Sequence, residues 1–375
     1  MNKKIVFLTG TRADFGKLKS LIDKIENSKK FDCYIFATGM HTIKKYGNTY
    51  GEIKKYNYKN LAIFRNYQHN THDLILAKTI EGFSNYVKKI KPDMIIIHGD
   101  RLEPLAGAIV GLFNNVLVGH IEGGEISGTV DEIIRHSITK LSHVHFVSNN
   151  EAKKRVIQMG ENPNSVFTIG SPDIEVMKKE ELPDVNIVKK YYDIKFDNYS
   201  IFIFHPVVTE ISYIRKQIKE ITNAITESKK NYVIIYPNND NGSNVIIKEI
   251  EKLRKNKNIK IFPTLRFKYF LSLMKNAKFI LGNSSSIVRE AEVFGTPAIN
   301  IGSRQKNRTK NTDIINVSPS KNKILDAIKS VEGLRFTPKS FFNKKENTTE
   351  LFYKTLLDEK IWKINLQKQF IDLRN

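Results

Sequence analysis

Acidic and histidine residues follow two apolar segments in the first half of the chain. Residues 94–97 and 116–118 are continuous apolar runs, the pattern of strands buried on both faces of a parallel sheet. Ligands of open α/β sheets bind outside the carboxyl ends of such strands. Crowded carboxyl groups there are suited to general acid and base catalysis, because repulsion raises the pKa of at least one toward neutrality. The polar residues that follow the two runs are His98, Asp100, Arg101, Glu103, His120, Glu122, Glu125 and Asp131.

Asp131 stands at the expected start of a helix. Residues 129–132 (TVDE) fit a capping box, and the helix should run to about Leu141. Asp131 and Arg135 are four residues apart and share a helix face, so an ordinary helical salt bridge would also explain them. Because the helix follows directly on the turn at 122–125 (EGGE), we favour a functional role for Asp131.

A glycine-containing turn follows the first expected strand. Residues 4–8 (KIVFL) lead into 10–16 (GTRADFG) and then a helix. Helix N-terminal amides beside Arg12 would suit a phosphate or another oxyanion. The turn is not a P-loop and lacks the full dinucleotide fingerprint, so spacing alone supports a plain tight turn equally well.

The second half carries a comparable set of polar residues after its strands. His205 follows the expected strand 199–204 and precedes a proline, where either a ligand contact or a satisfied turn histidine would fit. Residues 279–282 lead into Ser284 and Ser285, and serines that open the expected helix 287–294 would form an anion seat. Glu290 is expected about a turn and a half inside that helix. Its carboxylate could accept two sugar hydroxyls or pair with Arg289.

The elements needed to position these residues alternate between strand and helix. Such alternation predicts α/β domains with doubly wound parallel sheets. We expect an N-terminal domain over 1–180 with the carboxylates, a C-terminal domain over 181–355 that binds a diphosphate, and a closing helix in 356–375, over about 360–373. A cleft between the two domains would hold the ligand.

Composition excludes several classes of protein. The single cysteine, Cys33, excludes a disulfide framework and a thiolate metal site. No apolar run approaches the roughly 18 residues of a membrane helix, and the N-terminus lacks a secretory apolar core, so we expect a cytoplasmic protein without a membrane partner. The formal charge of +22 suggests either a nucleic-acid surface or a lysine-rich composition spread along the chain. Because the basic runs are short and lack interleaved aromatic residues, we favour the second interpretation.

The chain also resembles the hydrolysing UDP-N-acetylglucosamine 2-epimerases, which include bacterial sialic-acid-pathway enzymes and the epimerase half of the animal epimerase/kinase. The resemblance extends from residue 10 to the 300s, and its motifs lie at 10–14, 98–101, 120–129, 135–136, 205–207, 237–240, 282–285, 289–290 and 302–305. It implies a GT-B-like fold with two Rossmann-like domains. It also implies conversion of UDP-N-acetylglucosamine and water to UDP and N-acetylmannosamine, with no metal or organic cofactor. The family's proposed route is anti elimination of UDP to a 2-acetamidoglucal, followed by syn addition of water.

The resemblance also implies roles for individual residues. Acid and base catalysis falls to Asp100, Glu122 and Asp131, and His205 would help to stabilise the departing diphosphate. UDP contacts are implied for Arg12, Arg101, His205, Asn238, Ser284, Ser285, Glu290 and Arg304. Gly16 departs from the animal enzyme, which has a serine touching UDP there. The expected partner is a small nucleotide-sugar and not a nucleic acid, and the expected assembly is a homo-oligomer, either a dimer or a tetramer.

Three alternatives remain open. Related legionaminic-acid enzymes act on a nucleotide-linked 2,4-diacetamido-2,4,6-trideoxy sugar and have much the same motifs. A GT-B glycosyltransferase would share the fold and the diphosphate seat, but it would not need three clustered carboxylates. A basic nucleic-acid-binding protein would show steeply salt-dependent binding.

Overall fold

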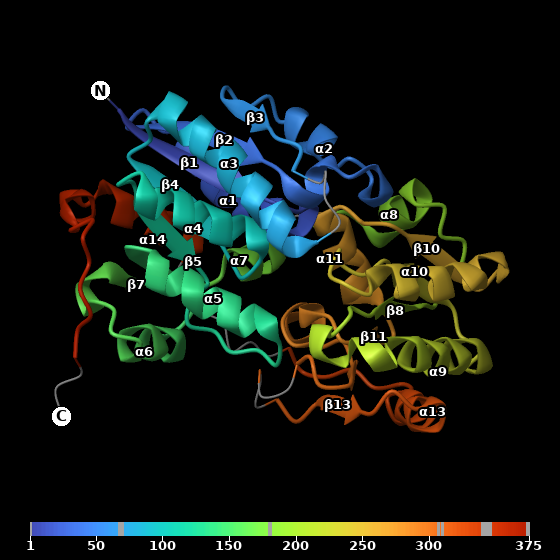
Figure 1. The fold of residues 1–375 in the computed structure, drawn as a ribbon. Coiled ribbons are helices and arrows are strands. Elements are labelled where there is room, and N and C mark those ends of the chain that lie inside the picture. Colours follow the sequence, from blue (N-terminus) through green and yellow to red (C-terminus); the bar gives the residue numbers. More distant parts are fainter. Residues whose placement is uncertain are drawn as a thin grey trace. The chain divides into compact units, whose positions relative to one another are not determined.

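The computed structural model describes residues 2–66, 71–178, 182–305, 308, 311–338 and 347–372. They fall into two compact units (Figure 1). The N-terminal unit contains the described residues up to 125, residues 131–176 and the described residues from 347 onward. The C-terminal unit contains residues 126–130 and the described residues between 177 and 338. The short segment between Glu125 and Asp131 therefore packs with the C-terminal unit, while the residues that flank it belong to the N-terminal unit.

The described part of the N-terminal unit has one seven-stranded sheet in the order β3-β2-β1-β4-β5-β6-β7, and its strand pairs are parallel. The strand order changes direction beside β1, so the crevice between β1 and β4 is the topological switch point where such sheets bind ligands. The strands are β1 (Lys3–Thr9), β2 (Phe31–Ala37), β3 (Leu61–Ile63), β4 (Met94–His98), β5 (Leu117–Ile121), β6 (Val144–Val147) and β7 (Val166–Thr168).

Helices cover both faces of this sheet because its strands are apolar on both sides. On β1, Ile5 and Phe7 join a core with α1 and α14, whereas Val6 and Leu8 join a second core with α3, α4 and α5 (Figure 1). The helices are α1 (Arg12–Glu26), α2 (Tyr50–Lys54), α3 (His72–Ile90), α4 (Leu102–Phe113), α5 (Val130–Leu141), α6 (Asn150–Gln158), α7 (Pro172–Lys178) and α14 (Thr348–Leu357).

The C-terminal unit repeats this architecture. Its described strands form a six-stranded parallel sheet in the order β10-β9-β8-β11-β12-β13, and α9, α10 and α13 cover one face. The strands are β8 (Ser200–Ile203), β9 (Tyr232–Ile235), β10 (Ile259–Phe262), β11 (Ile280–Gly282), β12 (Ala298–Ile301) and β13 (Ile314–Val317). The helices are α8 (Val185–Tyr191), α9 (Ile214–Glu227), α10 (Ser243–Glu251), α11 (Phe267–Asn276), α12 (Glu290–Phe294) and α13 (Lys321–Ser330). The predicted class, two α/β domains with parallel sheets, is confirmed.

The C-terminal region differs from the prediction. The helix expected over 360–373 is absent from the described residues, which instead form a 3-10 turn at Glu359–Lys363 and no regular element over 364–372. Tertiary contacts fix this turn, because Ile361 is buried in the core of the N-terminal unit and the Trp362 ring centroid lies 6.0 Å from that of Phe31. Helix α14 packs in the N-terminal unit, although it lies within the range 181–355 predicted for the second domain.

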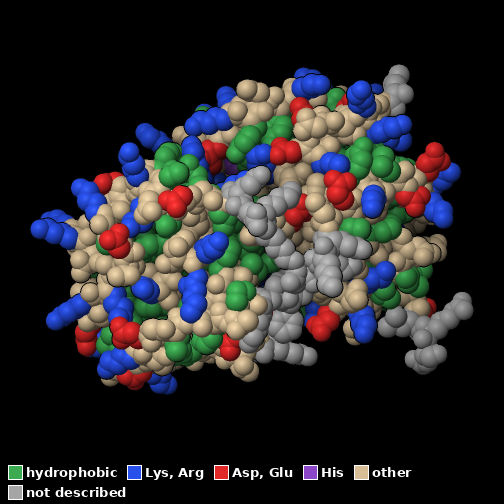
Figure 2. Space-filling model, turned by 180° about the vertical axis from the view of Figure 1, so that it is seen from behind, with side chains coloured by type: hydrophobic (Ala, Val, Ile, Leu, Met, Phe, Trp, Pro, Cys, Tyr) green, Lys and Arg blue, Asp and Glu red, His purple; other side chains and the backbone are tan. Residues whose placement is uncertain are grey.

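Charged side chains of both signs are spread over the surface. On the face shown in Figure 2, Lys and Arg side chains are interspersed with Asp and Glu over the described surface. None of the helices that the structure describes is both long enough and apolar enough to span a membrane.

Phe352 provides a test of how α14 is attached to the sheet. It is fully buried, and its ring centroid lies 6.3 Å from that of Phe7 and 4.9 Å from that of Phe146. We expect Phe352→Ala to lower the free energy of unfolding by about 3–5 kcal/mol, because it leaves a cavity in the core. Leu357→Ala, in the same helix but 47% exposed, should change it by less than about 0.5 kcal/mol. Equal losses in urea unfolding would contradict this packing.

Candidate active site

A charged histidine lies at the carboxyl edge of the N-terminal sheet. His98, the last residue of β4, places Nδ1 2.8 Å from Asp14 Oδ1 and Nε2 3.1 Å from Glu122 Oε2. Burial alone would lower the pKa of His98, but the Glu122 charge and hydrogen bonds with both carboxylates outweigh it and raise this pKa to about 9. At neutral pH both ring nitrogens therefore carry protons, and His98 holds the two carboxylates on either side of it.

Glu122 is held in an uncommon backbone conformation directly after β5. Its φ of 64° lies in the left-handed region that non-glycine residues seldom adopt, and its N–H donates to the Phe146 carbonyl at 2.9 Å. Besides His98, its carboxylate contacts the Ser171 hydroxyl, which also contacts Asp173. Strained backbone of this kind persists where surrounding contacts fix it, and it is typical of functional sites.

A buried arginine gathers the other predicted carboxylates. Arg135 of α5 is 2% exposed, pairs with Asp100 and donates to the Glu125 carbonyl at 2.9 Å. Burial opposes its charge, but Asp100, Glu125, Asp131 and Glu122 together raise the pKa of Arg135. The structure thus brings Asp100, Glu122 and Asp131 around one guanidinium. The structure gives Arg135 an ion pair with Asp100, 35 residues away, whereas Asp131, its helical neighbour considered from sequence, acts on it through charge.

The two arginines predicted to contact a diphosphate lie at the same sheet edge. Arg12 begins α1 and forms an ion pair with Glu52 of α2. Arg101 caps α4, and its Nε lies 3.7 Å from Oε2 of the fully buried Glu103. Burial raises the pKa of Glu103, whose side chain fills the space beside Gly10. Both guanidinium groups follow strands that flank the switch point, as an anion contact there would require.

Asn283 organises the corresponding edge of the C-terminal unit. It is 1% exposed, accepts from the His205 backbone N–H at 2.6 Å and donates to the His205 carbonyl at 2.8 Å. The backbone carbonyl of Asn283 accepts from Gln305 Nε2 at 2.9 Å and from the Arg304 guanidinium at 3.3 Å. Asn283, which follows β11, is therefore connected through its side chain to the turn after β8 and through its backbone carbonyl to the residues after β12.

His205 has a defined tautomer when neutral. Its Nδ1 accepts the Asn238 backbone N–H at 2.9 Å, so the ring proton resides on Nε2. An Nε2–H is suited to donate to a phosphate oxygen or a hydroxyl. The close packing at this turn depends on Gly282, which has a φ of 137° and whose Cβ, if present, would lie 1.8 Å from the Ile203 carbonyl oxygen.

The serine segment differs from the expected helix. Ser284 caps a 3-10 turn at Ser285–Ile287, and the α-helix that follows, α12, is only Glu290–Phe294. Glu290 is therefore the first residue of α12 and not a turn and a half inside a longer helix. Its side chain is buried, and Oε2 accepts no hydrogen bond from the described residues. Glu290 remains available as an acceptor for hydroxyl groups. The anion seat predicted at Ser284 and Ser285 is less well supported, because these serines open a short 3-10 turn and not the expected α-helix.

Sequence reasoning missed several residues of these clusters. Asp14 and Ser171 were not proposed as site residues, although Asp14 lies in the first turn of the helix that follows β1 and Ser171 lies between β7 and α7. Asn283 was noted only as part of a motif. The available signal was a polar residue after a buried strand, but that pattern does not reveal a partner 84 residues away, as for Asp14 and His98. Among the residues that the structure describes, no three His, Cys, Asp or Glu side chains converge as a metal site.

Comparison with known proteins identifies the family. The sequence model of a family described as UDP-N-acetylglucosamine 2-epimerase matches residues 23–364. A UDP-N-acetylglucosamine 2-epimerase of Neisseria meningitidis is 45% identical over 375 residues, covering 99% of both chains. The chain belongs to the UDP-N-acetylglucosamine 2-epimerase family. A UDP-N,N'-diacetylbacillosamine 2-epimerase (hydrolyzing) of Legionella pneumophila is 33% identical, with 88% of this chain and 89% of that protein covered. The resemblance inferred from the motifs is confirmed.

Solved structures of 2-epimerases have the same fold. That of Methanocaldococcus jannaschii UDP-GlcNAc 2-epimerase in complex with UDP-GlcNAc and UDP gives a TM-score of 0.78 at 24% identity, covering 94% of this chain and 99% of that one. That of Neisseria meningitidis UDP-GlcNAc 2-epimerase bound to UDP-GlcNAc gives 0.76 at 18% identity, with 94% and 99% covered. The GT-B-like class predicted from the resemblance is confirmed.

The environment of His98 predicts how stability depends on pH. A pKa raised from 6.5 to about 9 stabilises the folded state fully below pH 6.5, and this contribution is lost as the pH rises toward 9. The difference in unfolding free energy between wild type and His98→Asn should therefore shrink between pH 6.5 and 9.5. For His136, burial lowers the pKa, so the corresponding difference for His136→Asn should stay constant above pH 7. Parallel curves for the two variants would disprove the charged state of His98.

Proposed function

We propose that this protein is a hydrolysing UDP-N-acetylglucosamine 2-epimerase that converts UDP-N-acetylglucosamine and water to UDP and N-acetylmannosamine. The observation that carries the proposal is the gathering of Asp100, Glu122 and Asp131 around the buried Arg135 in a family of 2-epimerases. The name of the Neisseria relative supports the substrate, and the name of the Legionella relative supports the hydrolysing reaction. The product would serve the synthesis of sialic-acid-type sugars.

The chemistry explains why several carboxylates are needed. The hydrogen on carbon 2 of the sugar has no adjacent carbonyl to acidify it, so the bond from carbon 1 to the diphosphate must break as a base removes the proton. This anti elimination gives UDP and a 2-acetamidoglucal with a double bond between carbons 1 and 2. Syn addition of water then places a hydroxyl on carbon 1 and a proton on carbon 2, with the opposite configuration. One carboxylate takes the first proton and another activates the water.

The partners of the carboxylates suit these roles. Asp100 pairs with Arg135, and Glu122 contacts His98, so both carboxylates are held in a fixed orientation, as a base must be. Asp131 lies at the start of α5 and is partly exposed, where a proton can exchange with water. Substrate proton transfer is therefore assigned to these three residues as a set.

The leaving diphosphate requires hydrogen-bond donors that stabilise the negative charge that develops on it. We assign the His205 Nε2–H, Arg12 and Arg101 to this role, and preorganised donors of this kind contribute a few kcal/mol each. Asn238, Ser284, Ser285 and Arg304 would contact the nucleotide, and Glu290 would accept from ribose hydroxyls. We also propose that the enzyme is cytoplasmic and homo-oligomeric.

A second candidate substrate is a nucleotide-linked N,N'-diacetylbacillosamine. Proteins named for that substrate in Legionella pneumophila and Campylobacter jejuni are 33% and 36% identical to this chain, and each alignment covers more than four-fifths of it. The elimination would be the same, because the two sugars share the 2-acetamido group. They differ at carbons 4 and 6, which do not react.

Neutralising each carboxylate tests the catalytic set. Asp100→Asn, Glu122→Gln and Asp131→Asn should each lower turnover by ~10²–10⁴-fold while the protein stays folded, because each removes a base of nearly the same shape. Glu132→Gln, beside Asp131 on α5, serves as the matched control and should keep near-normal turnover. Full activity in any of the three variants would exclude the substituted residue from the mechanism.

A substrate panel in deuterated water distinguishes the candidates. UDP-N-acetylglucosamine and the UDP- and GDP-linked diacetylated sugars are incubated separately, and proton NMR follows the released sugar. We expect fastest release from UDP-N-acetylglucosamine, with deuterium at carbon 2 of N-acetylmannosamine. Faster release from a diacetylated sugar would select the second candidate, and substrate hydrogen retained at carbon 2 would exclude elimination.

A further inference from the structure

The turn that presents Asp100 is hydrogen-bonded to the neighbouring strand. Gly99 has a φ of 78°, a left-handed conformation that glycine adopts readily. Its N–H donates to the Ile121 carbonyl at 3.0 Å, and its carbonyl accepts from His120 Nε2 at 2.8 Å. Ile121 and His120 are adjacent residues of β5. The direction in which the chain leaves Gly99 toward Asp100 is therefore set by one backbone group and one side chain of β5.

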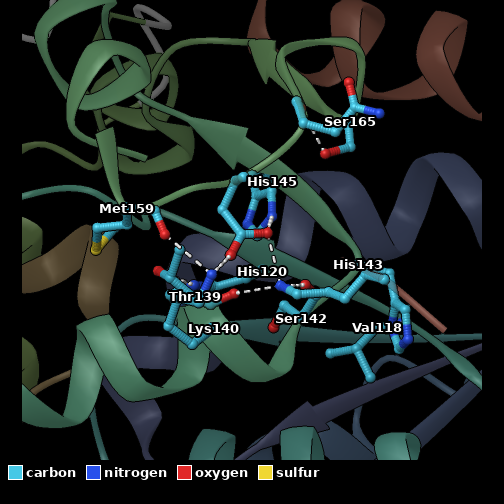
Figure 3. A network of polar contacts seen from close by, with 12 residues as sticks. Val118, His120, Thr139, Lys140, Ser142, His143, His145, Met159 and Ser165 are labelled. Atoms are coloured by element: carbon cyan, nitrogen blue, oxygen red, sulfur yellow. Dashed lines mark hydrogen bonds and ion pairs between the residues drawn. The ribbon is translucent and has the colours of Figure 1, made fainter. Parts of the chain in front are cut away.

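The same histidine also contacts the helix that supplies Arg135. The second ring nitrogen of His120, Nδ1, lies 3.2 Å from the hydroxyl oxygen of Thr139 on α5 (Figure 3). Thr139 is one helical turn after Arg135, on the same face. His120 thus joins the turn that carries Asp100 to the helix that carries Arg135, which are the two partners of the buried ion pair.

The protonation state of His120 follows from these contacts. A carbonyl oxygen only accepts, so Nε2 carries the proton toward Gly99. Burial lowers the pKa of His120 to about 3, so the ring is neutral. Its unprotonated Nδ1 faces the Thr139 hydroxyl, whose single proton is shared between this nitrogen and the Arg135 carbonyl oxygen, 3.1 Å away. A neutral ring fixes both elements without placing another positive charge near Arg135.

Gly123 shows how closely this pair is packed. A Cβ at Gly123 would lie 2.9 Å from His120 Nδ1 and 2.9 Å from the Thr139 hydroxyl oxygen. Any larger residue would push His120 and Thr139 apart. Gly123, which directly follows the predicted catalytic residue Glu122, therefore allows His120 and Thr139 to stay in contact.

We propose that His120 is a positioning residue, which orients the Asp100–Arg135 pair for the reaction through Gly99 on one side and Thr139 on the other. The proposal rests on the proposed function, because it concerns the geometry of that reaction. A displacement of the Asp100 carboxylate by about 1 Å is sufficient to slow a reaction by roughly 10²-fold. Loss of His120 should thus reduce kcat and leave nucleotide affinity unchanged.

His143 offers a matched control within the same network. It directly precedes β6, is buried and accepts from the Val118 N–H at 3.1 Å (Figure 3). It also donates to the Leu366 carbonyl at 3.0 Å. Like His120 it bridges two elements through both ring nitrogens, but it does not contact the Gly99 turn. A purely structural role would make the two histidines equivalent in their effect on activity.

The experiment measures kcat, KM, UDP affinity and urea unfolding for His120→Leu, His143→Leu, Thr139→Val and Thr139→Ser. We expect His120→Leu to lose roughly 10²-fold in kcat with unchanged UDP affinity, whereas His143→Leu loses stability alone. Thr139→Val should lose less than His120→Leu, and Thr139→Ser, which keeps the hydroxyl, should match wild type. Unchanged kcat in His120→Leu, or equal kcat losses in both histidine variants, would overturn the proposal.

A second readout separates this proposal from the proposed function. The ¹⁵N NMR signals of the Arg135 side chain, in protein labelled at arginine, report its pairing whether or not a sugar is turned over. His120→Leu should shift these signals, and His143→Leu should not. If the wild type were inactive on every nucleotide-sugar, the proposed function would fail, while unshifted Arg135 signals in His120→Leu would refute the positioning role.

Discussion

The N-terminal site depends on the burial of one positive charge. A guanidinium as enclosed as that of Arg135 would be costly without partners, because desolvation of an ion outweighs most single contacts. Here Asp100 pairs with it directly, the Glu125 carbonyl accepts a hydrogen bond from it, and the charges of Asp131 and Glu122 also stabilise it. The arginine in turn makes it possible to bring several carboxylates together, since without it their mutual repulsion would protonate or separate them.

In the C-terminal unit, hydrogen bonds of the neutral residue Asn283 fix the turn that carries His205. The Asn283 side-chain amide satisfies the His205 backbone N–H and carbonyl after β8, and the Asn283 backbone carbonyl accepts from the Arg304 and Gln305 side chains after β12. This arrangement fixes the His205 backbone while the Asn238 N–H fixes its ring. A histidine so constrained can offer Nε2–H in one direction, which is the property that recognition of an anion requires. Rigid donors lose little conformational entropy when a ligand binds.

The location of the candidate site could be predicted from sequence, whereas its partnerships could not. Apolar runs that end in polar turns placed Asp100, Glu122, His205 and Asn238 at sheet edges, because parallel strands present their carboxyl ends on one side. The pairing of His98 with Asp14 depends on strand order, which brings β1 beside β4. The predicted helix after Ser286 was interrupted because Arg289, with φ −102° and ψ −72°, departs from helical geometry. The closing helix failed for a related reason, since contacts of Ile361 and Trp362 with distant residues outweighed local periodicity.

His98 and His120 show why residue type alone cannot assign a role. Both lie at the ends of adjacent buried strands, and both are nearly or fully enclosed by protein. His98 faces two carboxylates, and its pKa rises to about 9, whereas His120 faces a carbonyl and a hydroxyl, and its pKa falls to about 3. One is therefore a cation that holds acids in place, and the other is a neutral bridge between backbone elements. The difference arises because the two side chains lie one register position apart and point to opposite faces of the sheet, His98 toward Asp14 of α1 and His120 toward Thr139 of α5. The register of β4 against β5 is thus as much a part of the site as the carboxylates are.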